Sequence, residues 1–278
     1  MLAQRPTEGD PVTANATTFR GLHANGTLLR LPNAWDAASA RLFESLGATA
    51  IATTSAGVAW SQGYPDGYAM PVEVVLAFAK NLVRVLQVPL SVDMEDGYSD
   101  DPAQVADLAA RLAEVGVAGI NLEDGRKPAE LLARKAEAIR ERLAKDGLDL
   151  FINARTDVVL ARLVDEGSQV EEAITRGHLY RSAGVDGLFV PGLTDAAQIQ
   201  AVVAGVDLPL NLMAWGGLAN ATQLQALGVK RLSAGSGIPQ VLWGHAAKLA
   251  TDFLQGGESD KLQGQIPYGQ MQNLFNGP

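Results

Sequence analysis

The sequence contains no cysteine and only three histidines among its 278 residues. The absence of cysteine excludes a disulfide framework, a thiolate metal site and a cysteine nucleophile. The histidines, His23, His178 and His245, lie outside the expected strand ends, so we assign none of them a catalytic or metal-binding role. Any chemistry in this protein must therefore rest on other side chains.

Clustered positive charge is also absent. The chain has 22 basic and 31 acidic residues, which gives a net charge of -9. Sequence-independent binding to nucleic acid needs clustered lysine and arginine, so the sequence argues against this class of partner. No apolar run reaches membrane length, and the start of the chain lacks the basic residues and apolar stretch of a signal peptide. We expect a cytoplasmic protein that binds neither nucleic acid nor membranes.

The chain does contain enough apolar sequence for one large core. Apolar residues make up 47% and charged residues 19%, and we treat residues 1–278 as a single domain. A glycine follows each of four amphipathic stretches, at Gly47, Gly116, Gly184 and Gly228, and an apolar run comes next. Glycine just past a helix end is the usual left-handed cap, and the run after it indicates a buried parallel strand. The repeating unit is a helix, a cap and a strand.

This repeat predicts eight strands separated by helices. The strands are expected at 28–32, 50–54, 90–93, 119–122, 150–153, 187–190, 210–212 and 231–234, and the intervening helices at 71–85, 101–115, 128–145, 170–183, 195–203 and 221–227. Alternating strands and helices on this scale favour an α/β fold of the (β/α)8 barrel type, with a doubly wound open sheet as the alternative. The numbers of residues and strands favour the barrel.

The two ends of the chain depart from the repeat. Residues 1–20 are polar without periodicity, which predicts a tail or a helix across the bottom of the barrel. Residues 239–278 form a C-terminal segment, with a helix expected at 241–254 and apolar residues such as Phe275 beyond it. Apolar residues past a completed barrel need a partner surface, which makes a homo-oligomer plausible.

Two neighbouring strands of this barrel end in acidic residues. Asp93 and Glu95 follow the third strand, and Glu123 follows the fourth. Hard cations such as Mg²⁺ favour carboxylates in this arrangement, some bound directly and others through water. The alternative is that the Asp-Gly pairs at 96–97 and 124–125 are ordinary turns with neighbouring acids as caps. Because two adjacent strands end alike, we favour a metal site.

Other strand ends carry residues suited to an anion. Arg155, after the fifth strand, has a planar guanidinium that binds a carboxylate or phosphate, although it is also a natural ion-pair partner for Glu123. The loop 53–57 offers small side chains and approachable N–H groups, as an ordinary turn also does. The glycine-rich stretches 216–217 and 235–237 occupy positions where many barrels bind phosphate. A phosphate ligand therefore remains a candidate.

The residues after the first strand divide between two roles. Trp35 is expected to line the mouth of the barrel, and Asp36 to cap the following helix.

Several motifs together resemble those of the isocitrate lyase and phosphoenolpyruvate mutase superfamily. The resemblance covers Phe19 to Leu254 and is carried by Asn33–Asp36, Thr54–Gly57, Val92–Tyr98, Asn121–Asp124, Asn153–Asp157 and Asn211–Leu212. It implies a modified (β/α)8 barrel whose eighth helix is exchanged between the subunits of a dimer or tetramer. Such domain swapping would account for the apolar C-terminal segment.

The resemblance also implies roles for individual residues. Asp93, Glu95 and Glu123 match the acids that hold Mg²⁺, or Mn²⁺ in its place, directly or through water. Asp66, on the loop after the second strand, and Arg155, facing the substrate, match residues of the catalytic machinery. Contacts to the carboxylate and keto oxygen of a 2-oxo acid are implied for Trp35, Ser55, Ala56, Gly57, Asp93, Arg155 and Asn211.

These roles imply one kind of chemistry. A 2-oxo acid chelates the metal, and bond cleavage next to its carbonyl leaves charge on an enolate oxygen, which Mg²⁺ and Arg155 would stabilise. We therefore expect a Mg²⁺-dependent carbon–carbon lyase acting on, or binding, a small 2-oxo or 2-hydroxy di- or tricarboxylate. The alternatives are an enzyme of the phosphonopyruvate or phosphoenolpyruvate mutase type, and a 2-oxo-acid-binding protein without catalysis.

One segment departs from the family pattern. The lyases carry a long gating loop with a catalytic cysteine after the fourth strand, and the mutases carry a loop with lysine and asparagine. Here Glu123–Pro128 runs directly into the next helix, so a proton donor and a cover that excludes water are both missing. The candidates to replace the donor are Lys127, Tyr64, Tyr68 and Tyr98.

Overall fold

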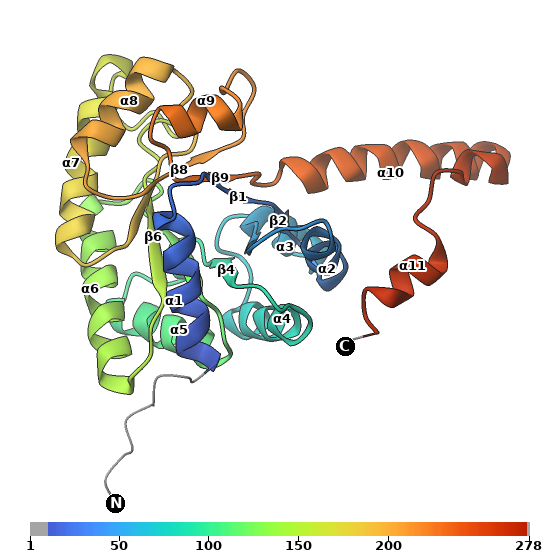
Figure 1. Cartoon of the computed structure of the whole chain (residues 1–278), viewed down its shortest axis with the longest axis horizontal. Helices are drawn as coiled ribbons and strands as arrows, with labels where there is room; N and C mark the ends of the chain where they lie inside the picture. The colour runs from blue at the N-terminus through green and yellow to red at the C-terminus, as the bar shows by residue number, and fades with distance from the viewer. Residues whose placement is uncertain (1–10, 277–278) are drawn as a thin grey trace, which may run out of the picture.

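The structure is a computed structural model that describes residues 11–276. Within this range, nine parallel strands form one sheet in the order β1-β9-β8-β7-β6-β5-β4-β3-β2 (Figure 1). They are β1 (Leu29–Leu31), β2 (Asn33–Ala34), β3 (Ile51–Thr53), β4 (Leu90–Asp93), β5 (Gly119–Glu123), β6 (Phe151–Arg155), β7 (Gly187–Phe189), β8 (Leu210–Met213) and β9 (Arg231–Ser233). All eight strands expected from the sequence are present, each within two residues of its predicted ends.

The sheet closes into a barrel at Pro32. β1 and β2 are two halves of the first strand, and β1 pairs with β9 while β2 pairs with β3. Proline has no N–H to donate, so the ladder breaks there, although the carbonyl of Pro32 still accepts from Ala52 N at 3.2 Å. The ninth strand is therefore a break in the first of eight. The barrel prediction is confirmed, and the open doubly wound sheet is excluded.

Helices surround the barrel (Figure 1). They are α2 (Ala37–Ser45), α4 (Val72–Val85), α5 (Pro102–Glu114), α6 (Ala129–Asp146), α7 (Gln169–Ser182), α8 (Ala196–Gly205) and α9 (Ala221–Ala226), with the short α3 (Ser55–Ser61) after β3 and the 3-10 turn η1 (Glu166–Ser168) before α7. The four repeated glycines lie just past helix ends with φ of 92° at Gly47, 99° at Gly116, 88° at Gly184 and 91° at Gly228. These left-handed caps confirm the repeat read from the sequence.

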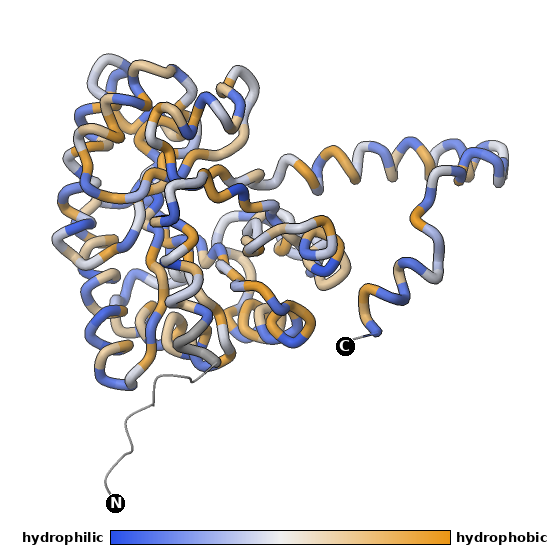
Figure 2. Tube along the Cα trace, viewed as in Figure 1, coloured by the Kyte–Doolittle hydropathy of each residue, from blue (hydrophilic) through white to orange (hydrophobic). Residues whose placement is uncertain are grey.

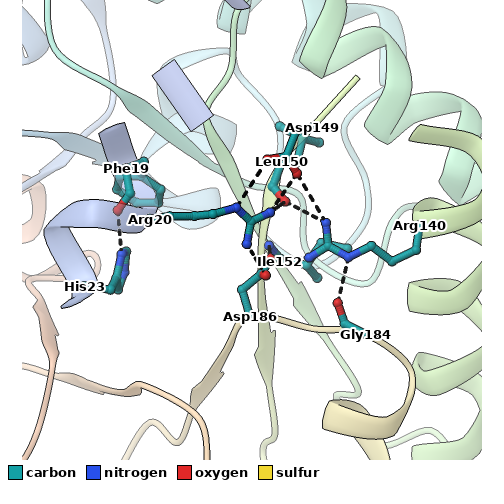
Figure 3. Close-up of polar contacts among 9 residues, drawn as sticks. All are labelled: Phe19, Arg20, His23, Arg140, Asp149, Leu150, Ile152, Gly184 and Asp186. Carbon is teal, nitrogen blue, oxygen red and sulfur yellow. Dashed lines mark hydrogen bonds and ion pairs between the residues drawn. The ribbon is translucent and has the colours of Figure 1, made fainter. Parts of the chain in front are cut away.

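Helix α1 (Pro11–Ala24) lies across the N-terminal ends of the strands. Phe19 is buried there, and the His23 ring stacks on Phe151 at the start of β6, with ring centroids 4.1 Å apart. Figure 3 shows how Arg20 fixes this helix: its guanidinium donates to Asp149 Oδ1 at 2.7 Å, to the Leu150 carbonyl at 2.9 Å and to Asp186. Residues 1–10, the rest of the predicted tail, lie outside the described range.

The interior of the barrel is partly polar. The main apolar core packs between the strands and the outer helices, with Ile120, Leu122 and Ile152 among its fully buried members. On the inner side of the ring, Asn121, Asn153, Asn211 and Arg231 are all buried, at 4% exposure or less. This polar layer extends the barrel mouth inward from the strand ends.

The C-terminal segment projects from the barrel as an arm. Helix α10 (Gly237–Gly256) runs away from the body of the molecule, and η2 (Ser259–Leu262) and α11 (Tyr268–Asn273) follow it (Figure 1). Apolar residues recur along α10 in Figure 2, and Pro239 is its one buried residue. Arg41 Nε on α2 donates to the Leu274 carbonyl at 2.7 Å, so the end of the arm turns back toward the barrel.

Exposed apolar side chains mark this arm. Val241 is 63% exposed, Phe253 52% and Leu254 83%. No helix in residues 11–276 combines the length and apolar composition needed to cross a membrane.

Candidate active site

A cavity of about 220 Å³ opens at the carboxyl ends of the strands. Polar residues from β2, β4, β5 and β6 face apolar residues that follow β6 to β8. The lining is Asn33, Thr54, Ser55, Ala56, Asp66, Asp93, Asn121, Arg155, Leu160, Phe189, Met213, Trp215, Ser233, Gly235 and Ser236. In (β/α)8 barrels this end of the sheet carries the active site, so the cavity is the candidate site.

Asp93 is one of the two acids that line this cavity. It ends β4, and its backbone N–H donates to Thr53 Oγ1 at 2.8 Å, which ties the tips of β3 and β4 together. Its Oδ2 accepts from Ser55 N at 3.3 Å, and Oδ1 accepts from Glu95 N at 3.4 Å. Both bonds are long, so the carboxylate keeps most of its capacity to bind a further donor or a cation.

Glu95 lies just beneath Asp93 in an unusual backbone conformation. Its φ is 51°, in the left-handed region that residues with a side chain rarely adopt, and such strain is often found at functional sites. Oε2 accepts from the backbone N–H of Tyr68, whereas Oε1 is buried without a hydrogen-bond partner among residues 11–276. Burial, helped by the charge of Asp93, raises the pKa of Glu95 to about 7.

Glu123 and Arg155 form a buried ion pair beside the cavity. Arg155 Nη1 lies 2.7 Å from Glu123 Oε2, and Arg155 also donates to Asp157 through Nε at 2.7 Å. The Tyr68 hydroxyl donates to Glu123 Oε1 at 2.9 Å. Burial raises the pKa of Glu123 and the charge of Asp93 adds to this, whereas Arg155 opposes it and favours the charged carboxylate. Burial also works against a charged Arg155, yet Glu123 and Asp157 raise its pKa overall.

Asp66 completes the acidic side of the cavity. It lies on the loop between α3 and α4. Partial burial and then the charge of Asp93 raise its pKa. The cavity therefore carries more negative than positive charge, and Arg155 is its only cationic lining residue among those that the structure describes.

A metal ion bound directly by several side chains needs donors that converge on one point. Within residues 11–276, no three acidic or histidine side chains lie close enough to form a metal cluster, so Asp93, Glu95 and Glu123 do not converge as three direct ligands. Burial is the main cause of the raised pKa of Glu95 and of Glu123, so a nearby cation would stabilise the charged form of each carboxylate. Carboxylate oxygens of this kind are donors that suit a hard cation.

Comparison with known proteins identifies the family. The family model of phosphoenolpyruvate phosphomutase matches residues 19–254. The chain belongs to this family. Within the wider isocitrate lyase and phosphoenolpyruvate mutase superfamily, the 2-methylisocitrate lyase of Halalkalibacterium halodurans is 31% identical over 229 residues, which cover 74% of this chain and 73% of the lyase.

Two further relatives of the phosphomutase family cover nearly the whole chain. An uncharacterized protein of Mycobacterium tuberculosis is 38% identical over 260 residues, which cover 92% of this chain and 95% of that protein. A crystal structure of a protein provisionally named a lyase/mutase from Burkholderia cenocepacia has a TM-score of 0.87 and 32% identity, covering 97% of this chain and 98% of that one. The superfamily resemblance drawn from the motifs is confirmed.

A short turn occupies the place where the resemblance implies a lid. β5 ends at Glu123 and α6 begins at Ala129, and the turn is closed by a 2.9 Å hydrogen bond from Lys127 N to the Asp124 carbonyl. Lys127 Nζ donates to Asp96 Oδ2 at 2.6 Å and to Asp100, and the bonds to Asp100 and Asp96 raise its pKa. Lys127 is thus engaged in ion pairs and is a poor proton donor.

The three tyrosines named as alternative donors lie in different surroundings. The Tyr68 hydroxyl is bound to Glu123, and the Tyr98 hydroxyl is buried without a partner in the described part of the chain. Burial raises the pKa of both phenols. Tyr64 packs against the apolar core, and none of the three lines the cavity.

The turn interpretation is correct for two of the acids. Asp96 accepts from Tyr98 N at 2.9 Å and pairs with Lys127, which closes the turn after β4. Asp124 accepts from Arg176 at 2.8 Å and from the Tyr180 hydroxyl at 2.7 Å, and its side chain is fully buried. Both aspartates therefore hold loops in place, and Asp93 faces the cavity instead.

The cavity gathers part of the predicted site. Ser55, Ala56, Asp66, Asp93 and Arg155 line it, whereas Glu95 and Glu123 lie behind this lining. Trp35, Gly57 and Asn211 are buried nearby and do not line it.

Trp35 and Gly57 pack against other residues, whereas the buried Nδ2 of Asn211 has no hydrogen-bond partner among residues 11–276. The Trp35 ring packs on Phe43 and on Trp243 of α10, with centroids 6.0 and 6.3 Å apart. A Cβ at Gly57 would lie 2.6 Å from Thr54 Cγ2, so glycine permits close packing there rather than ligand contact. Asn211 accepts from the Ser233 hydroxyl at 3.4 Å.

Sequence reasoning missed part of the cavity wall. Asn33 and Asn121 stand within the quoted motifs, but they were given no role, and the apolar wall of Leu160, Phe189, Met213 and Trp215 was not anticipated. Trp215 follows β8 directly, so the rule that barrel sites sit at strand ends would have found it.

Proposed function

We propose that this protein is a Mg²⁺-dependent lyase that cleaves a carbon–carbon bond in a small 2-oxo or 2-hydroxy di- or tricarboxylate. The observation that carries the proposal is the meeting of Asp93 and Arg155 in one small cavity at the barrel mouth. A volume of about 220 Å³ suits an acid of a few carbon atoms. Relatives named for an activity, among them the 2-methylisocitrate lyase and oxaloacetate decarboxylases, support carbon–carbon cleavage.

Each residue of the cavity has a role in this proposal. Asp93 would hold the cation directly, with Glu95 and Glu123 reaching it through water. When bound, Mg²⁺ would supply positive charge for the enolate oxygen that bond cleavage leaves. Arg155, fixed by Glu123 and Asp157, presents its guanidinium to a substrate carboxylate.

The loop after β3 would bind the other end of the acid. Ser55 and Ala56 line the cavity, and Ala56 is buried, so backbone N–H groups of this loop approach the ligand closely. Asp66 is the remaining ionisable group on the cavity wall and is our candidate acid or base, because its pKa is raised. Lys127 on the short turn is engaged in a hydrogen bond to Asp96, so it does not compete with Asp66 for the role of acid or base.

Two alternatives keep specific support. A phosphonomutase from Burkholderia cenocepacia, itself provisionally named, has 35% identity and a TM-score of 0.81, which keeps phosphonate chemistry in view, although the lysine and asparagine lid is absent. A binding protein without catalysis would need the same cavity and no proton donor. The open mouth favours a ligand that needs little protection from water.

The arm is proposed to act between subunits. Its exposed apolar residues, such as Val241 and Leu254, would be covered by the barrel of a second copy in a homodimer or homotetramer. We propose that α10 is exchanged between the two copies.

The test is calorimetric titration of a panel of 2-oxo acids and phosphonopyruvate, with Mg²⁺ and then with EDTA, followed by turnover assays on the compounds that bind. Metal-dependent binding of a 2-oxo dicarboxylate, with its cleavage into a 2-oxo monocarboxylate and carbon dioxide, is the expected result. Turnover of phosphonopyruvate alone would establish the mutase alternative. Binding without turnover would indicate a binding protein, and no metal-dependent binding would overturn the proposal.

A further inference from the structure

Arg231 is buried in the middle of the barrel without a carboxylate partner. It is 1% exposed, and it forms no salt bridge with any residue that the structure describes. Its Cζ lies 5.8 Å from the centroid of the Phe19 ring, which covers the barrel from below. Burying a guanidinium unpaired is costly, so this residue needs a reason other than stability.

The hydrogen bond that Arg231 makes is to Asn121. Nη2 donates to Asn121 Oδ1 at 3.2 Å, while Nε and Nη1 find no partner within residues 11–276. The same oxygen accepts from Asn153 Nδ2 at 2.9 Å. A chain of side chains therefore crosses the barrel interior from β9 to β5 and β6.

This bond fixes which way the Asn121 amide points. A guanidinium only donates hydrogen bonds, so the amide must turn its oxygen toward Arg231. In the opposite orientation, the Asn121 amino group would face the N–H donors of Arg231 and Asn153. The amide oxygen would then lose both hydrogen bonds. The amino group of Asn121 is therefore directed away from the polar layer.

That amino group reaches the cavity. Asn121 lines the cavity, and its Nδ2 makes no hydrogen bond in the described structure, yet it is not among the buried atoms that lack a partner. Asn121 is also the register partner of Asp93 on the neighbouring strand β4. A neutral N–H donor thus lies on the cavity wall beside the acid proposed to hold the cation.

We propose that Asn121 donates a hydrogen bond to an oxygen of the bound 2-oxo acid, and that Arg231 is the positioning residue that orients its amide for this contact. Arg231 itself does not line the cavity, and its hydrogen bond to a cavity-lining residue is the one to Asn121. The identity of the ligand rests on the proposed function, whereas the orientation of the amide does not. The pair would add a directed contact without adding charge to the cavity.

The first experiment measures affinity for oxalate, whose adjacent carboxylates imitate a 2-oxo acid, by calorimetry with Mg²⁺. Asn121→Ala should weaken binding about tenfold to a hundredfold, as loss of a hydrogen bond to a charged group does. Arg231→Met should weaken it by a similar factor, and the double variant should bind no more weakly than Asn121→Ala alone. Arg30→Met is the matched control, because Arg30 is an exposed arginine on the adjacent strand β1.

Two more variants separate positioning from folding. Arg231→Lys keeps an obligate donor and should retain part of the affinity that Arg231→Met loses. Asn121→Asp keeps both acceptor bonds and gains an ion pair with Arg231, so it should fold, while its new carboxylate repels oxalate and weakens binding at least about tenfold. The proposal would be overturned if folded Arg231→Met or Asn121→Asp bound oxalate with wild-type affinity. It would also be overturned if the losses of affinity in the two single variants added up in the double variant.

A second readout is independent of any ligand. The side-chain amide resonance of Asn121, assigned by its absence in Asn121→Ala, should shift in Arg231→Met and stay in place in Arg30→Met. An unshifted resonance would overturn the orienting role. If wild-type protein binds neither oxalate nor any 2-oxo acid, the proposed function and the ligand contact both fail, and the orienting role is then decided by the resonance alone.

Discussion

Arg155 and Glu123 are register partners on neighbouring strands, and their charged groups lie 2.7 Å apart. The residue expected to face the substrate is therefore held by one of the acids expected near the metal. Arg155 also lines the cavity, so the observed ion pair is compatible with the proposed substrate contact. The ion pair fixes the direction of the Arg155 side chain, which is the one cationic side chain that lines the cavity in the described part of the chain.

Replacing Arg155 should damage stability and binding together. Arg155→Met leaves Glu123 and Asp157 buried without their cation, and breaking a buried pair in this way costs about 3–5 kcal/mol. Urea unfolding at pH 7.5 measures that loss, and calorimetry with oxalate and Mg²⁺ should show no binding. Arg155→Lys keeps the charge but loses the forked geometry, so its affinity should fall more than its stability.

A second substitution separates the two effects. Glu123→Gln in the Arg155→Met background removes one unpaired carboxylate and should recover part of the lost stability without restoring oxalate binding. If the urea midpoint of Arg155→Met equals that of the wild type, the ion pair does not stabilise the fold.

Asp93 should matter for the metal and little for the fold. Asp93→Ala removes two long hydrogen bonds, of 3.3 and 3.4 Å, whose combined loss should cost about 1 kcal/mol. Binding of oxalate should no longer differ between Mg²⁺ and EDTA, whereas the melting temperature should change by a few degrees at most. Metal-dependent affinity that survives in Asp93→Ala would contradict the assignment of the cation to this residue.

The sequence predicted the barrel well because its signals are local. Apolar runs mark the buried strands, and glycines such as Gly116 mark the helix ends that precede them. The break at Pro32 was not foreseen, because it depends on one strand pairing with two different neighbours. The short helix α3 was likewise read as a loop, since its seven residues contain no helical periodicity.

Only part of the site could be predicted. Charged residues at strand ends can be recognised in the sequence, but their ion-pair partners cannot. Asp93 and Asp96 look alike in the sequence, yet Lys127, 31 residues away, pairs with the second. Asp124 is paired by Arg176, at a separation of 52 residues, which no local pattern reveals. Asn121 stands within an apolar strand and is recognised as a site residue only once the barrel places it beside Asp93.

His23 should make the protein less stable in mild acid. Its Nδ1 binds the Phe19 carbonyl at 2.8 Å, and burial, with the charge of Arg231, lowers its pKa from 6.5 to about 3. The unfolded chain therefore binds a proton below pH 6.5 that the folded chain does not, so stability falls as the pH falls through the window from 6.5 to 3. Between pH 7.5 and 5.5 the loss from this group should be about 1.4 kcal/mol.

The control for this effect keeps the ring and removes the titration. His23→Phe preserves an aromatic side chain to stack on Phe151, and its unfolding free energy should depend less on pH than that of the wild type over this window. Urea unfolding of both proteins at pH 7.5 and 5.5 gives the comparison. Parallel pH profiles would show that His23 is not the group responsible.

The C-terminal arm should determine the oligomeric state. Phe253 and Leu254 are 52% and 83% exposed at the end of a helix that leaves the barrel, and burying such side chains against a second copy is favourable by about 1.5–3 kcal/mol each. Deleting the residues after Leu254, or replacing Phe253 by aspartate, should lower the sedimentation coefficient to that of a smaller assembly. Gln255→Asp, at an exposed polar position of the same helix, is the matched control.

The exchange of α10 gives a sharper expectation than oligomerisation alone. The Trp243 ring on this helix packs on Trp35 and Trp60 of its own barrel, with centroids 6.3 and 5.6 Å away, so the root of the arm stays with its subunit. Substitutions beyond that root should therefore dissociate the assembly without unfolding the barrel, because the core does not include them. Dissociated protein whose barrel stays folded would support exchange, whereas unchanged sedimentation of both arm variants would contradict it.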